Sequence, residues 1–123
     1  MTRFIDTDEF AKLQPRFLPG DAYAELQQEL TANPEKGRVM PGCGGLRKVR
    51  IADPRRQKGK RGGARVIYLH IPEVDQFLML DIYGKGEKED LTSAERKRLR
   101  AFAQEYKTKI IDVCKAAKKE QQE

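Results

Sequence analysis

The segment "GARVIYLHIPEVDQFLMLDIY", residues 63–83, decides the fold. Residues 63–71 are rich in β-branched and aromatic side chains, which favour a β-strand. Residues 76–83 are almost continuously apolar, which is typical of a strand buried on both faces. A third strand is predicted at "LRKVRI", residues 46–51. Because no helix-length segment separates these strands, a parallel crossover is excluded and an antiparallel meander is expected.

The chain before the meander is predicted to form a strand at Arg3–Thr7 and then two helices. The first helix should begin at a capping pair formed by Asp6 and Glu9, and Pro15 should kink or shorten it. The second helix should begin at the N-cap Asp21. The apolar residues expected in the core are Phe10, Leu13 and Phe17 of the first helix and Ala22, Leu26 and Leu30 of the second.

The Gly- and Pro-rich residues 37–45 are predicted as turns, and a long helix is predicted after the meander. Thr92 and Glu95 form a capping box at its start. The apolar stripe expected to face the core comprises Leu99, Phe102, Tyr106, Ile110, Val113 and Ala117. Residues 118–123 are expected to fray. The whole order predicts a single α+β domain over residues 1–123, with helices covering a small antiparallel sheet.

Composition limits the possible classes of protein. Charged residues make up 36% of the 123 residues and hydrophobic residues 38%, which predicts a small core under a highly charged surface. The sequence has no run of about 18 apolar residues and no apolar signal-peptide core, so we expect a cytoplasmic protein that does not cross a membrane. Cys43 and Cys114 lie far apart without neighbouring metal ligands, so reduced thiols are expected, with a disulfide as the alternative.

Positive charge is concentrated within the meander. Residues 47–65 contain nine Lys and Arg residues and one Asp, a net charge of +8, whereas the whole chain carries +6. Strand alternation places Lys48 and Arg50 on one face and Arg47 on the other. Arg65, on the next strand, is expected to be exposed and close to Lys48 and Arg50, unless a bulge beside the preceding glycines turns it to the other face.

Clustered like charges repel one another, so this region predicts an anionic partner. Phosphate is suitable because Arg binds its oxygens through paired N–H donors, and nucleic acid adds the release of counterions. A solvated hairpin that only aids solubility remains the alternative. A membrane surface fits less well, because the segment lacks an amphipathic helix with aromatic anchors.

More candidate residues follow the last strand of the meander. In "YGKGEKEDL", residues 83–91, Tyr83 and Lys85 lie at the strand end beside the basic hairpin, and Lys88 follows within a turn. Tyr83 is expected either to stack on a base or to cap the core.

Cleavage of RNA without a metal needs a base for the 2′-hydroxyl, positive charge at the scissile phosphate and an acid for the leaving oxygen. Lys48 is a candidate base, because neighbouring arginines would lower its pKa. His70 lies inside a strand and is expected to be structural. No cluster of Cys and His residues suggests a metal site.

Three motifs in this order and spacing, "GGLRKVR", "KRGGARVIY" and "IYGKGEKEDLT", resemble the RelE/HigB family of bacterial toxins, in particular its HigB-like branch. The resemblance covers about residues 3–107 and implies a compact antiparallel sheet with helices on it. It implies an mRNA interferase, an endoribonuclease that uses no metal or cofactor and cleaves codons in the ribosomal A site by attack of the 2′-hydroxyl. It also implies a neutralising antitoxin with a helix-turn-helix domain, similar to HigA, through which alone the protein would contact operator DNA.

The resemblance also implies roles for individual residues. The strand lysine of the family and the next basic residue correspond to Lys48 and Arg50. The arginine of the G-x-R-[VL]-[VI]-Y motif corresponds to Arg65, with Tyr68 three residues later, and Arg65 would stabilise charge on the scissile phosphate. The catalytic candidates are Lys48, Arg50, Arg65, Lys85, Lys88 and Tyr83. The candidates for binding RNA and the ribosome are Arg47, Arg55, Arg56, Lys58, Lys60 and Arg61.

The sequence departs from the family in two places. Some members have an arginine where this chain has Gly86, and some use a C-terminal histidine or tyrosine where this chain offers Thr92 or Tyr83. The general acid is therefore not assigned. A non-catalytic RNA-binding module and a ParE-like toxin that poisons gyrase remain as alternatives, and the basic residues on the strands favour the nuclease over the ParE-like toxin.

Overall fold

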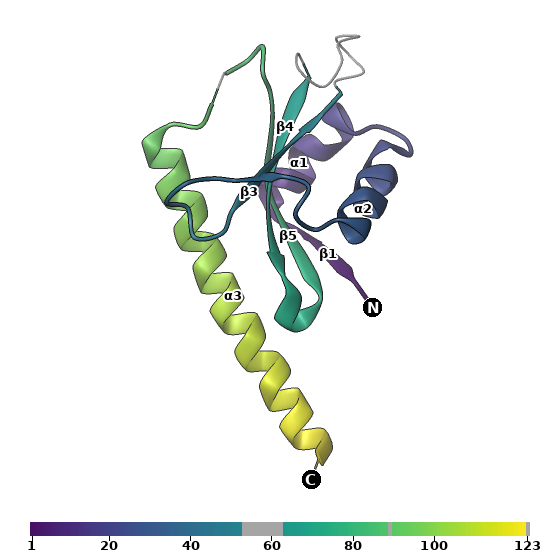
Figure 1. Cartoon of the computed structure of the whole chain (residues 1–123), viewed down its shortest axis with the longest axis vertical. Coiled ribbons are helices and arrows are strands. Elements are labelled where there is room, and N and C mark those ends of the chain that lie inside the picture. The colour runs from purple at the N-terminus through teal and green to yellow at the C-terminus, as the bar shows by residue number, and fades with distance from the viewer. Residues whose placement is uncertain (53–62, 89, 123) are drawn as a thin grey trace.

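The computed structural model describes residues 1–52, 63–88 and 90–122, and these residues form an α+β fold (Figure 1). The elements are β1 (Arg3–Asp6), α1 (Asp8–Phe17), α2 (Ala22–Ala32), β2 (Arg38–Val39), β3 (Arg47–Ile51), β4 (Ala64–Ile71), the 3-10 turn η1 (Pro72–Val74), β5 (Gln76–Gly84) and α3 (Ser93–Gln122). The predicted α+β class and the predicted order of the main elements are confirmed.

The strands in the described ranges form one five-stranded sheet with the order β1-β5-β4-β3-β2. β3, β4 and β5 pair antiparallel, which confirms the predicted meander. The expectation of an entirely antiparallel sheet is wrong, because β1 pairs parallel with β5. The prediction of turns throughout residues 37–45 is also wrong, because β2 pairs antiparallel with β3 and forms the other edge. Two residues are too few to show the alternation from which a strand is recognised.

The two faces of the sheet are covered by different helices (Figure 1). α1 and α2 lie on one face, where Phe10 and Leu30 pack with Tyr68 of β4. α3 lies on the other face, where Leu99 packs with Leu80 of β5. Because both faces are covered, every residue of β5 is buried, as predicted from its continuous apolar sequence.

The first two helices differ from their predicted starts in detail. Thr7, and not Asp6, caps α1, because its hydroxyl accepts a hydrogen bond from the Phe10 amide. α1 continues through Pro15 to its end at Phe17. Asp21 is the N-cap residue of α2, as predicted, although its side chain makes no capping hydrogen bond.

The capping box at the start of α3 is confirmed. The Thr92 amide donates to Glu95 Oε1 at 2.9 Å, and the Glu95 amide donates to Thr92 Oγ1 at 3.1 Å. The helix continues to Gln122, and the fraying expected for residues 118–123 stays a prediction. Its last turns extend past the end of the sheet (Figure 1).

The predicted apolar stripe of α3 is only partly correct. Leu99 is buried, and Tyr106 and Ile110 are half-buried against the core of that face. Phe102 and Val113 are instead 49% and 61% exposed. A regular spacing identifies the apolar side of a helix, but it does not show how much of that side the sheet covers.

The β2–β3 connection crosses the sheet to reach α3 (Figure 1). Arg100 Nη1 donates to the Gly42 carbonyl at 2.9 Å, and Gln104 Nε2 donates to the Gly44 carbonyl at 3.0 Å. Cys43 in this connection and Cys114 on α3 are both free thiols, as expected.

Candidate nucleic-acid interface

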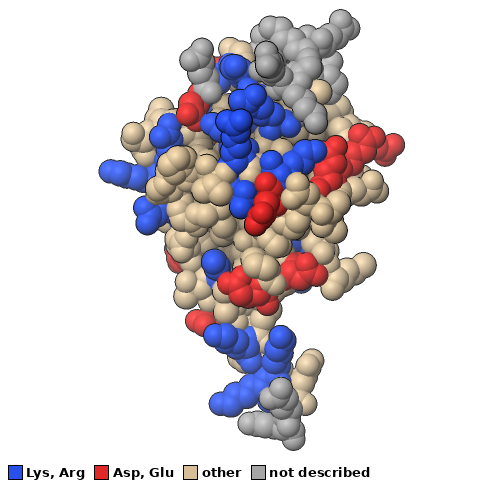
Figure 2. Space-filling model, in the orientation of Figure 1, with Lys and Arg blue, Asp and Glu red and all other residues tan. Residues whose placement is uncertain are grey.

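The pairing of β3 with β4 brings the basic strand residues together. Arg50 and Arg65 are cross-strand partners, and Lys48 lies two residues from Arg50 on β3. The register irregularity of the β4–β5 hairpin lies beyond Arg65, between Ile67 and Tyr68, so Arg65 stays on the same side as Lys48 and Arg50. We call Lys48, Arg50 and Arg65 the strand cluster. The expectation that these three side chains share one neighbourhood is confirmed. Figure 2 shows Lys and Arg side chains gathering on the upper half of one face, with acidic side chains beside them.

Arg65 is buried rather than exposed, which corrects the sequence expectation. Only 5% of its surface is accessible, and Nη1 donates to the Ala64 carbonyl at 3.2 Å. Its cross-strand neighbours flank it on both sides, Arg50 on β3 and Tyr83 on β5. Burial, together with the nearby charge of Arg50, lowers the pKa of Arg65 from its usual value. A guanidinium remains charged in proteins, so the site holds a preplaced positive charge with restricted hydration.

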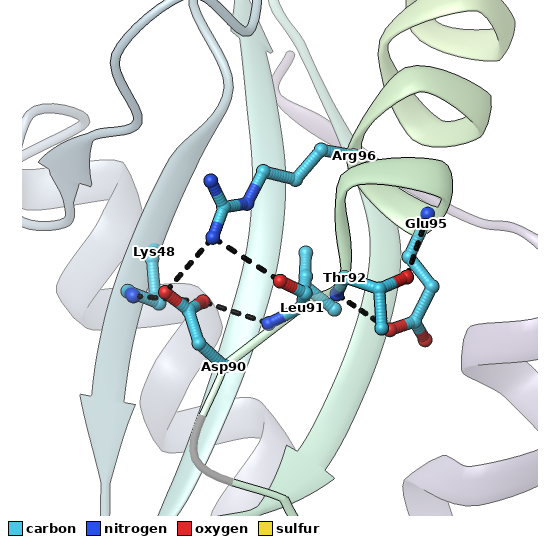
Figure 3. A network of polar contacts seen from close by, with 6 residues as sticks. All are labelled: Lys48, Asp90, Leu91, Thr92, Glu95 and Arg96. Carbon is cyan, nitrogen blue, oxygen red and sulfur yellow. Dashed lines mark hydrogen bonds and ion pairs between the residues drawn. The ribbon is translucent and has the colours of Figure 1, made fainter.

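Asp90 lies between the strand cluster and the start of α3 (Figure 3). Its Oδ1 is 3.4 Å from Lys48 Nζ, and its Oδ2 is 3.2 Å from Arg96 Nη2. Partial burial acts against ionisation, but the hydrogen bond from the Leu91 amide and the charges of Lys48 and Arg96 outweigh it and lower the pKa of Asp90. The carboxylate therefore remains an anion at a position where two cations from separate elements converge.

This contact bears on the predicted role of Lys48. The sequence interpretation considered only the cations around Lys48, because Asp90 is 42 residues away along the chain. The structure shows that Lys48 also has an acidic neighbour, because its Nζ forms an ion pair with Asp90. Asp90 and Arg96 are the members of this site that sequence reasoning missed, although both lie next to the predicted helix start.

Tyr83 lies opposite Arg65 on β5. Its ring belongs to the core between the sheet and α3, and only 3% of the residue is exposed. Stacking on a base is therefore blocked in this structure, and the alternative of a core cap is favoured. The buried hydroxyl has no hydrogen-bond partner in the described residues, and burial, helped by the charge of Asp90, raises the pKa of Tyr83 to about 12. Lys88 Nζ lies 5.0 Å from the centre of this ring and 2.6 Å from Glu95 Oε2.

The other candidate residues are spread more widely. Lys85 is exposed just after β5. Arg47 Nη1 donates to the Gly37 carbonyl at 2.8 Å, so Arg47 fastens the start of β2. His70 stacks on Phe77 with ring centres 4.6 Å apart, which fits the expected structural role. Five predicted RNA-binding residues lie outside the described part of the chain: Arg55, Arg56, Lys58, Lys60 and Arg61.

Comparison with models of known protein families gives no match for this chain. Within residues 1–52, 63–88 and 90–122, no helix is both long enough and apolar enough to span a membrane. The same residues contain no group of three or more His, Cys, Asp or Glu side chains placed to hold a metal ion.

Proposed function

We propose that this protein is a RelE/HigB-type toxin, a ribosome-dependent endoribonuclease that cleaves mRNA in the cytoplasm. The observation that supports this proposal best is the pairing of Arg50 with Arg65, with Lys48 beside them on one face of the sheet. Two guanidinium groups and an ammonium group in this arrangement suit the oxygens of a phosphodiester. A helix-turn-helix antitoxin, similar to HigA, is proposed as the partner that neutralises the protein.

In this proposal, the 2′-oxygen of the RNA attacks the adjacent phosphorus, a 2′,3′-cyclic phosphate forms, and the bond to the 5′-oxygen breaks. Arg50, which is exposed, contacts the phosphate oxygens, and the buried charge of Arg65 beside it helps to stabilise the negative charge that grows there. Asp90 releases Lys48 and Arg96 when the phosphate arrives, since the phosphate replaces the carboxylate as their counter-charge. Lys48 then lies next to the reacting phosphate and adds positive charge there. The proton of the 2′-hydroxyl passes to solvent, and solvent supplies a proton to the departing 5′-oxygen.

A non-catalytic RNA-binding module is the second candidate. It is favoured by the ion pair between Lys48 and Asp90 and by the burial of the Tyr83 hydroxyl, because both features leave the site without an evident base and acid. The positive charges would then hold a phosphate without promoting its cleavage.

The test is to add the purified protein to a translating extract and to map new 5′ ends on the message. The wild type should cut within codons, and Arg50→Lys, which keeps the charge but loses the paired donors of an exposed guanidinium, should cut about 10²–10³ times more slowly. Thermal unfolding of both proteins would show whether the substitution disturbs the fold. Inhibition of translation without new 5′ ends would replace the nuclease by the RNA-binding module, and breaks in DNA without loss of message would replace it by a gyrase poison.

A further inference from the structure

A groove with a volume of about 610 Å³ runs along β2 and β3 beside the strand cluster. Four basic residues line it, namely Lys36, Arg38, Lys48 and Arg50. No acidic residue is among its lining residues in the described ranges. Val39, which is 53% exposed, and Pro41 add an apolar surface. Lys48 belongs to both the groove and the strand cluster, so the two are continuous.

Two of these cations have no counter-charge in the described part of the chain. Arg38 and Arg50 are exposed and form no side-chain hydrogen bond or ion pair there, whereas Lys36 pairs with Glu29 at 2.6 Å and Lys48 pairs with Asp90. Arg38 is the cross-strand partner of Lys48. Neighbouring positions across an antiparallel pair lie about 4.5–5.5 Å apart, and alternate positions along a strand about 7 Å apart. The groove therefore carries positive side chains at three neighbouring positions of the sheet, a charge pattern that favours an anionic strand such as a nucleic acid.

Hydrogen bonds hold the backbone at Gly37, the residue before Arg38 and the start of β2. The Tyr68 hydroxyl accepts a hydrogen bond from the Gly37 amide at 3.0 Å and donates to the Pro34 carbonyl at 2.8 Å. A Cβ atom at Gly37 would lie 2.9 Å from the Tyr68 ring, so only glycine allows this close contact. Arg47 Nη1 donates to the Gly37 carbonyl at 2.8 Å. Less backbone conformational freedom is therefore lost at this position when a ligand binds.

We infer that this groove holds the nucleotides next to the cleaved phosphodiester, with Arg50 on the cleaved phosphate, Arg38 on a neighbouring phosphate and Val39 against a base. This inference rests on the proposed function for the substrate class, single-stranded RNA. An apolar wall beside a row of cations matches the alternation of bases and phosphates in such a strand. Arg38 and Val39 thereby become binding residues that determine the path of the RNA.

The test measures binding of a short, fluorescent, uncleavable 2′-O-methyl oligoribonucleotide between about 50 and 200 mM salt. Arg38→Gln should weaken binding about fivefold at 0.1 M salt and lower the slope of log affinity against log salt by about 0.7, the value for one phosphate contact on a single strand. Val39→Ser should weaken binding without changing the slope, because it removes an apolar contact and no charge. Arg3→Gln is the matched control, since Arg3 is an exposed arginine on β1, the opposite edge strand.

The inference is overturned if Arg38→Gln binds like the wild type, if Arg3→Gln weakens binding equally, or if the wild type does not bind the oligonucleotide. It is also overturned if Arg38→Gln weakens the binding of an acidic peptide but not the binding of the oligonucleotide. Cleavage by the same preparations in a translating extract separates this question from the proposed function. If the wild type cleaves the message and Arg38→Gln binds the oligonucleotide as tightly as the wild type, the groove is refuted and the nuclease is not. If binding depends on Arg38 but the wild type cleaves no message, the nuclease is refuted and the groove is not.

Discussion

Replacing Asp90 by Asn tests whether its carboxylate occupies the position of a phosphate. The substitution removes a negative charge that lies 3.4 Å from Lys48 Nζ and 3.2 Å from Arg96 Nη2. The side-chain oxygen of Asn can still accept the hydrogen bond from the Leu91 amide. The paired side chains are 29–46% exposed, and ion pairs of this kind contribute about 0.2–1 kcal/mol each. The free energy of unfolding should therefore fall by about 0.4–2 kcal/mol, which denaturant titration can measure.

The same interactions should have the opposite effect on binding. A phosphate that binds Lys48 and Arg96 must first displace the carboxylate of Asp90. Asp90→Asn removes this cost, so the free energy of binding should become more favourable by about 0.4–2 kcal/mol. The affinity for an uncleavable oligoribonucleotide should rise by about two- to thirtyfold at low salt. The gain should shrink as salt increases, because partly exposed charges are screened.

A matched control is Glu105→Gln, which removes one negative charge from an exposed pair with Lys109 on α3, away from the strand cluster. If Asp90→Asn binds RNA no more tightly than the wild type, or no more tightly than the control, the carboxylate does not hold the place of a phosphate.

Three further predictions concern the core and the helix start. Tyr83→Phe removes a buried hydroxyl that has no hydrogen-bond partner in the described residues, so stability in denaturant should stay equal or rise by about 1 kcal/mol; a marked loss would reveal a partner. The hydrogen bond from Lys88 is the main cause that lowers the pKa of Glu95 from 4.5 to about 2. Because this pKa is depressed in the fold, the ionised Glu95 contributes its full stabilisation above pH 4.5 and loses it as the pH falls towards 2. The free energy of unfolding of Glu95→Gln should therefore fall less than that of the wild type between pH 4.5 and pH 2. Leu99→Ala should cost about 2–5 kcal/mol and Phe102→Ala clearly less, because Phe102 is 49% exposed; equal thermal shifts would contradict the observed packing of α3.

The features that the sequence predicted correctly depend on neighbouring residues. The capping box of Thr92 and Glu95 spans one helical turn, and the meander follows from short connections between apolar strands. These signals are complete within a few residues, so they can be recognised without the fold.

The features that were missed depend on contacts between distant parts of the chain. Arg65 alternates like a surface residue, and its burial follows only from the strands on both sides of β4. The pair of Lys48 with Asp90 joins β3 to the segment before α3, and no spacing rule connects them. Arg38 was missed because a two-residue strand was hidden among turn-forming residues. The proximity of Lys48, Arg50 and Arg65 was thus predictable, whereas the burial of Arg65 and the counter-charge of Lys48 were not.

The parallel pairing of β1 with β5 also determines when the fold can be completed during synthesis. Arg3 pairs with Gln76, so the N-terminal strand has no partner strand in the described sheet until the ribosome has released about two thirds of the chain. Pairing over such a sequence separation requires closure of a long loop and slows folding. Asp90 and Arg96 emerge later still. A nascent chain therefore exposes the basic β3 segment before its carboxylate partner exists, and the ordered assembly of charge on this surface is one of the last events of folding.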